Sequence, residues 1–167
     1  MDVSIGAKIW CEILERPKDI VMQAAKAAFQ IASIAIERES EVSVCLSTDA
    51  EVRVLNRIHR NKDQPTNVLA FPAFDSGDLD RLPPEAPVCL GDIIIAFETA
   101  TVEAEAEAKT FKDHISHLVI HGMLHLLGHD HETEDKARIM EFLEVDALNQ
   151  LGVGNPYSSD NQWANGS

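Results

Sequence analysis

Three short runs of the chain have the hydrophobic pattern of β-strands. Residues 41–47 (EVSVCLS) alternate apolar and polar side chains, the period of two that a half-buried strand shows. Residues 67–72 (NVLAFP) and 90–97 (LGDIIIAF) are compact apolar runs rich in branched and aromatic side chains, and Pro72 stops the first of them. We therefore predict one half-buried strand and two core strands.

Five longer segments instead repeat their apolar side chains with the helical period of about 3.6 residues. They are residues 17–39, 48–57, 98–109, 111–127 and 134–151. Pro17 suits the first turn of the first segment, and Thr48 with Glu51 forms a capping-box pattern at the start of the second. The alternation of strands and helices predicts a domain that contains both.

Two segments lack either pattern. Residues 75–87 combine Asp and Gly with three prolines, which predicts an exposed loop. Residues 152–167 contain turn residues and little to bury, so we expect a flexible C-terminal tail. The 167 residues fit one domain, which we place at residues 1–151.

Composition indicates the environment and the binding partners that we expect for this domain. Cys11, Cys45 and Cys89 are an odd, scattered set, which favours reduced thiols in a cytoplasmic protein over disulfides. No apolar run approaches the roughly 18 residues of a membrane span, and the start lacks the pattern of a signal peptide. The net charge of −14 weighs against indiscriminate nucleic-acid binding, so any nucleic acid would have to meet a local basic patch or come with a partner.

The segment HGMLHLLGHDH, residues 121–131, holds the clearest candidate chemistry. His121 and His125 are four residues apart and would face the same way on a helix. Gly128 can end that helix, so the following loop can bring His131 to the same point. Three histidine ligands leave a tetrahedral zinc with one open position, where bound water has a pKa near 7. The spacing therefore indicates a catalytic metal site.

Other histidines allow alternatives. His129 can compete with His131 as the third ligand, although it is one residue off the pattern. For His114 and His117, one and two turns earlier on the same stripe, packing or hydrogen bonding around the site is the favoured interpretation.

Two further features concern the reaction. Gly122 stands where the zinc-protease motif H-E-x-x-H has its general-base glutamate, which disfavours a peptidase. Arg57, His59, Arg60 and Lys62 form a compact basic cluster in an otherwise acidic chain. The cluster can serve chemistry, or it can simply be a solvated helix end that suits the helix dipole.

Taken together, these motifs resemble those of the YbeY endoribonucleases, the ribosomal RNA maturation factors. HGMLHLLGHDH is similar to the family signature H-G-x-L-H-L-x-G-Y-D-H, with His129 in place of its tyrosine. LNRIHRNKDQPTNVLAFP and LGDIIIAF resemble two further family motifs in the same order. The resemblance spans residues 40–148.

The resemblance implies a single α/β (α+β) domain with a small, mixed four-stranded sheet, flanked by about five helices. It implies one zinc ion at the end of a central helix, bound by His121, His125 and His131. Arg60 matches an arginine needed for function and is assigned with His121 to the catalytic centre, where it would bind the scissile phosphate. We expect the cleft beside Asn67 to bind RNA.

In function, the resemblance implies cleavage of single-stranded RNA, maturation of the small-subunit ribosomal RNA 3′ end and ribosome quality control. The expected partners are ribosomal RNA, the small subunit and its assembly proteins, with no membrane involved. Two alternatives stay open: a metallopeptidase-like hydrolase, and a non-catalytic, zinc-containing ribosome-assembly factor.

Overall fold

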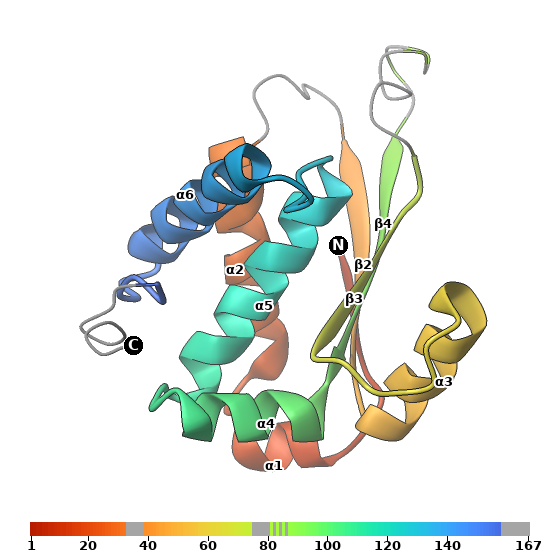
Figure 1. Cartoon of the computed structure of the whole chain (residues 1–167), viewed down its shortest axis with the longest axis vertical. Coiled ribbons are helices and arrows are strands. Elements are labelled where there is room, and N and C mark those ends of the chain that lie inside the picture. Colours follow the sequence, from red (N-terminus) through yellow and green to blue (C-terminus); the bar gives the residue numbers. More distant parts are fainter. Residues whose placement is uncertain (33–38, 75–80, 82, 84, 86, 158–167) are drawn as a thin grey trace.

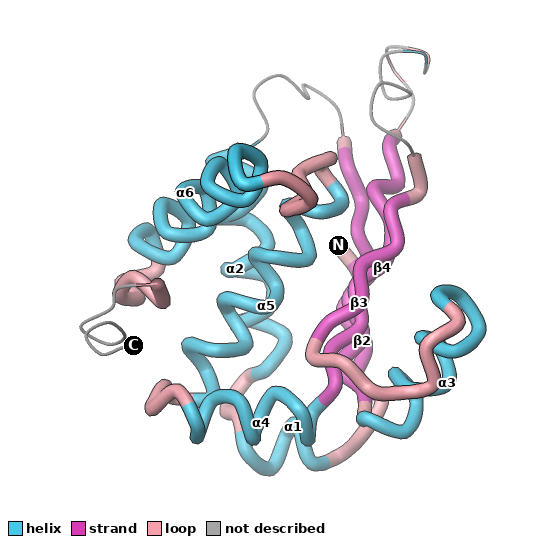
Figure 2. Tube along the Cα trace, viewed as in Figure 1, coloured by secondary structure: helices cyan, strands magenta, loops and turns pink. Residues whose placement is uncertain are grey.

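A mixed four-stranded sheet forms the centre of the protein (Figure 2). The structure is a computed structural model that describes residues 1–32, 39–74, 81, 83, 85 and 87–157. The strands are β1 (Asp2–Ile5), β2 (Ser40–Ser47), β3 (Val68–Pro72) and β4 (Val88–Ala96), in the spatial order β1-β2-β4-β3. β1 and β4 pair with β2 in parallel, and β3 pairs antiparallel with β4. β3 is thus an edge strand.

Helices cover both faces of this sheet (Figure 1). Those in the described part of the chain are α1 (Ile9–Ile13), α2 (Pro17–Ala32), α3 (Asp49–Arg60), α4 (Phe97–Ala106), α5 (Phe111–Leu126) and α6 (Glu134–Gln150). α2 and α5 pack side by side on one face, with α6 outside them, and α3 lies on the opposite face. The predicted single α/β domain with a mixed four-stranded sheet is confirmed.

The two faces bury very different cores. The larger core joins α2 and α5 to the inward side chains of β2 and β4, among them Val44, Ile93 and Ile95, each at most 1% exposed. The smaller core lies under α3, where Val52 contacts Leu69 of β3. Burial of apolar surface at roughly 25 cal/mol per Å² makes the α5 face the main source of stability. The helix that carries the histidines is therefore anchored firmly.

Several predicted boundaries shift. The helix predicted for residues 17–39 ends earlier than its pattern suggested: helix is described to Ala32, residues 33–38 lie outside the described residues, and Glu39 is not helical. The carbonyl of Glu39 accepts a hydrogen bond from the Val88 amide, so this part of the chain is already entering the sheet. α3 runs to Arg60, three residues beyond the predicted Arg57. The Thr48 side chain accepts from the Glu51 amide at 3.4 Å, as the capping pattern predicted.

The sequence pattern missed two short elements, β1 and α1. Of the predicted loop at residues 75–87, the described residues are exposed and the others lie outside the described part of the chain. The tail remains a prediction for residues 158–167, which also lie outside it. Before them, however, the half-buried Val153 packs on the main core and Tyr157 bonds to Glu144, so this part of the tail does contact the folded domain.

Candidate metal centre

The end of α5 turns the chain back on itself, as the position of Gly128 predicted. Gly128 has φ +99°, a backbone conformation that glycine adopts without strain. Its amide donates to the His125 carbonyl at 3.0 Å, and the His129 amide donates to the Leu124 carbonyl at 2.9 Å. These two bonds form a Schellman cap. The loop that follows returns His131 toward the helix.

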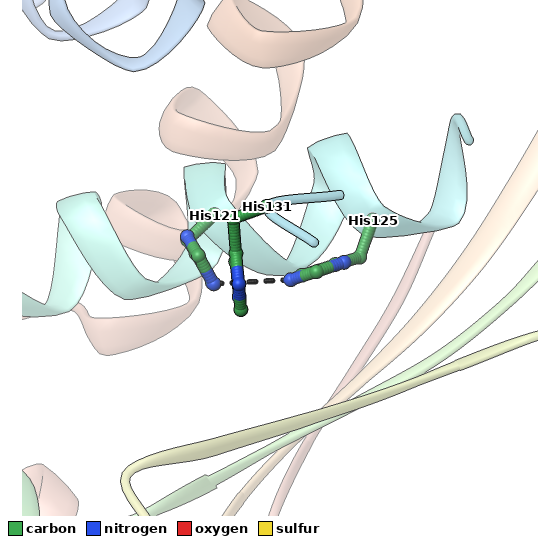
Figure 3. A group of neighbouring side chains, drawn as sticks. All are labelled: His121, His125 and His131. Atoms are coloured by element: carbon green, nitrogen blue, oxygen red, sulfur yellow. Dashed lines mark hydrogen bonds between the residues drawn. The ribbon is translucent and has the colours of Figure 1, made fainter. Parts of the chain in front are cut away.

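His121, His125 and His131 converge on one point (Figure 3). One ligand nitrogen from each ring lies within 4.8 Å of the other two. The Nε2 atoms of His121 and His125 are 3.1 Å apart. Two nitrogens on one tetrahedral zinc, each at about 2.0–2.1 Å, would be separated by about 3.3 Å. The three residues therefore fit a metal ion and form a possible three-histidine metal site.

The ionisation of His125 also suits a ligand. Burial, together with the neighbouring His121 and His131, lowers the pKa of His125 to about 4. The ring is therefore neutral at pH 7 and keeps a lone pair for a metal. His129 takes no part in this group: its backbone amide completes the helix cap, and its side chain is not among the described residues that could share a metal.

A buried carboxylate from α6 supports the site from behind. Glu144 is 1% exposed, and its Oε2 accepts a hydrogen bond from Nδ1 of His121 at 3.1 Å. Its Oε1 accepts from Nε2 of His117 and from the hydroxyl of Tyr157, the latter at 2.7 Å. Burial opposes ionisation of Glu144, but these hydrogen bonds prevail and lower its pKa to about 2. Glu144 is thus a carboxylate that binds three donors.

His114 has a separate partner. Its Nε2 lies 2.9 Å from Oε1 of Glu103 on α4, and burial lowers the pKa of the ring. Asn67 donates from Nδ2 to the same carboxylate at 3.0 and 3.2 Å. The favoured interpretation of His114 and His117 as hydrogen-bonded residues around the site is therefore confirmed. Asn67 reaches the wall of the site with its amide nitrogen already engaged.

A cleft of about 400 Å³ opens beside the three histidines. β3 forms one wall and α5 the other, and Arg60 reaches in from the last turn of α3. The guanidinium of Arg60 lies 6.0 Å from the centre of the Phe71 ring, and its Nη2 is 3.5 Å from the Ala70 carbonyl oxygen. All four residues of the basic cluster, Arg57, His59, Arg60 and Lys62, are exposed, but of these only Arg60 is among the residues that line the cleft. The described residues that line the cleft include no carboxylate.

Gly122 has a packing role as well as a chemical one. A Cβ atom at this position would lie 3.0–3.2 Å from three side-chain atoms of Ile93 on β4. α5 therefore approaches the sheet so closely here that a Cβ atom would fit only if the Ile93 side chain shifted by a few tenths of an ångström. Gly122 lines the cleft, and a glutamate at this position would crowd Ile93.

A sequence model of the YbeY endoribonucleases matches residues 11–152 of this chain. The chain belongs to the YbeY endoribonuclease family. The match is wider than the resemblance seen in the motifs alone, since it includes the end of α1 and the whole of α2. The assignment places the chain among the hydrolases named as endoribonucleases.

Relatives support the assignment along nearly the whole chain. An endoribonuclease YbeY of Rhodopseudomonas palustris is 45% identical over 161 residues, which cover 96% of this chain and 91% of the relative. The endoribonuclease YbeY of Azorhizobium caulinodans is 46% identical over 160 residues, 95% and 96% of the two chains. A Thermotoga maritima protein solved in solution shares the fold, with a TM-score of 0.57 and 21% identity over 96% of this chain and 98% of its own.

None of the described helices combines the length and the apolar character that crossing a membrane requires.

Proposed function

We propose that this YbeY-family protein is a zinc-dependent endoribonuclease that cleaves single-stranded RNA. The observation that carries the proposal is the cleft in which three histidines on α5 and its loop face Arg60 on α3. Its biological role in this proposal is maturation of the 3′ end of small-subunit ribosomal RNA, together with ribosome quality control in the cytoplasm. The family membership supports RNA as the substrate.

One zinc ion would be held by His121, His125 and His131, whose nitrogens converge and whose His125 ring is neutral. When bound, such an ion acts as a Lewis acid that lowers the pKa of water and polarises a phosphoryl oxygen. On the side of the cleft opposite the histidines, Arg60 supplies a positive charge and several N–H donors. A guanidinium in that position stabilises the negative charge that develops on a phosphate during cleavage.

The size of the cleft favours an unpaired strand. About 400 Å³ lies within the range of sites that bind one small molecule, which suits one or two nucleotides. Single strands can enter such a cleft because their backbone and bases are free to adapt. The chain carries a net charge of −14, so we propose that the ribosomal small subunit and its assembly proteins deliver the RNA.

The arrangement speaks against a peptidase. Peptidases of the H-E-x-x-H type need a glutamate next to the first histidine, and Gly122 is packed on Ile93 at that position. The described residues lining the cleft supply no replacement carboxylate.

Arg60→Gln provides the main test. We expect cleavage of a single-stranded RNA to fall by about 10²–10³-fold, the usual cost of losing one donor that stabilises a developing charge. Zinc content and thermal stability should stay at wild-type values. Arg57→Gln, one turn earlier on α3 and outside the residues that line the cleft, is the matched control and should cleave normally.

Three results would contradict the proposal: wild-type protein without bound zinc, full cleavage by a folded and metal-free His121→Ala variant, or hydrolysis of casein in place of RNA. Normal zinc content with no RNA cleavage under any condition would favour the non-catalytic assembly factor.

A further inference from the structure

We propose that Glu144 is the positioning residue of the metal centre, and that Tyr157 and His117 hold its carboxylate in place. This inference rests on the proposed zinc site. It assigns a role to two elements outside the histidine motif: the inner face of α6 and the segment that follows it. Tyr157 also lies beyond residues 11–152, the part of the chain that the family model matches.

The geometry at His121 carries the first step. An imidazole can give one nitrogen to a metal only if its proton sits on the other nitrogen. Oε2 of Glu144 lies 3.1 Å from Nδ1 of His121, so the carboxylate holds the proton there. Nε2 of His121 is then left as the lone-pair nitrogen, and it is this atom that lies 3.1 Å from Nε2 of His125. Carboxylates in this position fix both the tautomer and the ring orientation of a histidine ligand.

The burial of Glu144 carries the second step. A carboxylate that is 1% exposed is costly unless its oxygens have partners. Oε1 receives two donors, His117 from α5 and the Tyr157 hydroxyl at 2.7 Å. The rings of His117 and Tyr157 also meet edge to face, with centroids 5.6 Å apart. The carboxylate is therefore fixed on one oxygen and orients His121 with the other.

Tyr157 makes the C-terminal segment part of the support. After α6, Gly152 adopts φ +76° and the Val153 amide donates to the Leu148 carbonyl at 3.0 Å, which redirects the chain. The chain then passes along α6 and places the Tyr157 hydroxyl on Glu144. The segment after α6 thus contacts the carboxylate that orients His121, and its Tyr157 hydroxyl also lies 3.3 Å from Nε2 of His117.

The first experiment measures zinc affinity by competition with a chromophoric chelator. Glu144→Gln should weaken zinc binding by about 10–100-fold, the usual cost of losing an outer hydrogen-bond partner of a ligand. Tyr157→Phe should weaken it by a smaller factor, because His117 still holds the carboxylate. Glu103→Gln is the matched control, since Glu103 also pairs with an α5 histidine but that histidine, His114, is not in the metal site. Its zinc affinity should equal that of wild type.

A second readout needs no metal. Nitrogen-15 NMR of the metal-free protein distinguishes the two neutral tautomers of His121. Wild type should carry the proton on Nδ1, and Glu144→Gln should show a mixture of tautomers. A merely structural ion pair between α5 and α6 would change thermal stability without moving this signal.

The outcomes separate the two proposals. A wild-type protein that binds no zinc would overturn the proposed function itself. Zinc binding by wild type, with unchanged affinity and tautomer in Glu144→Gln, would overturn the positioning role alone. If Glu144→Gln fails to fold, Tyr157→Phe decides, because it removes one hydroxyl from a residue that is 42% exposed. Equal zinc affinity of Tyr157→Phe and wild type would then reject the proposal that Tyr157 holds the Glu144 carboxylate in place.

Discussion

The two halves of α5 each carry a pair of histidines at almost the same spacing, but the two pairs have different roles. In the first half, His114 and His117 are covered by α4 and α6, and each ring is paired with a carboxylate. In the second half, His121 and His125 face each other across 3.1 Å at the edge of a cleft. Helical spacing brings rings to one face in both cases. What covers that face decides whether a ring contacts protein alone or, like His121, also presents its second nitrogen to the cleft.

The largest difference in zinc affinity should appear when one histidine ring is removed from each half of α5 in turn. His125→Ala should weaken zinc binding by more than the roughly 10–100-fold cost of an outer partner, and RNA cleavage should fall to background. His114→Ala should retain zinc and lose only stability, because its ring is buried against Glu103. Zinc affinity and thermal unfolding of both variants test the contrast, which fails if the two lose zinc alike.

The third ligand sharpens the contrast further. His131→Ala should weaken zinc binding less than His125→Ala, since two helical ligands remain on a rigid element. His129→Ala should bind zinc as wild type does, because its side chain lies outside the group of three. Stronger loss in His129→Ala than in His131→Ala would reassign the ligand.

The close approach of the second half to the sheet predicts a loss of stability. Gly122→Glu must push against Ile93, and overpacking of this kind costs about 1–3 kcal/mol in the free energy of unfolding. Urea denaturation measures the loss. The double variant with Ile93→Val should recover part of it, and the Gly122→Glu protein should show no peptidase activity on casein. Wild-type stability would mean that α5 can move away from β4.

The smallest expected effect is a dependence on pH in metal-free protein. Folding lowers the pKa of His125 from 6.5 to about 4, so the unfolded chain binds more protons between these values. The free energy of unfolding is therefore highest, as far as His125 is concerned, above pH 6.5, and it falls as the pH drops toward 4. Because the ring is partly exposed, we expect about 1–2 kcal/mol and not the full shift. His125→Gln should flatten this part of the stability curve measured in urea.

Local signals predicted most of the fold. The helices with side-chain caps, such as α3 at Thr48, begin where the sequence placed them. α1 has five residues and no side-chain cap at Lys8, and β1 has only four residues, so neither repeats a pattern long enough to recognise. Such elements form because the main core already provides a surface for Trp10 and Val3. Tertiary packing of this kind leaves no periodic trace.

The residues of the metal site also divide into those that local sequence signals predicted and those that only tertiary packing brings in. His121, His125 and His131 lie within eleven residues, so helix geometry and one glycine suffice to bring them together. Arg60 approaches from another helix: the basic cluster of residues 57–62 included it, but only the family resemblance singled it out. Glu144 and Tyr157 were missed altogether. A signal for Glu144 did exist: it lies four residues from both Met140 and Leu148, a carboxylate on the buried face of α6.

The position of β3 at the edge of the sheet has a further consequence for behaviour in a crowded solution. An open edge offers unpaired backbone groups on which strands of other chains can add, which leads to aggregation. Here the strand is five residues long and ends at Pro72, and the guanidinium of Arg60 lies against the carbonyl of Ala70. A short strand, a proline and a positive charge are the features that discourage such pairing. Under the proposed function, this edge can stay open to RNA while the addition of a strand from another chain is discouraged.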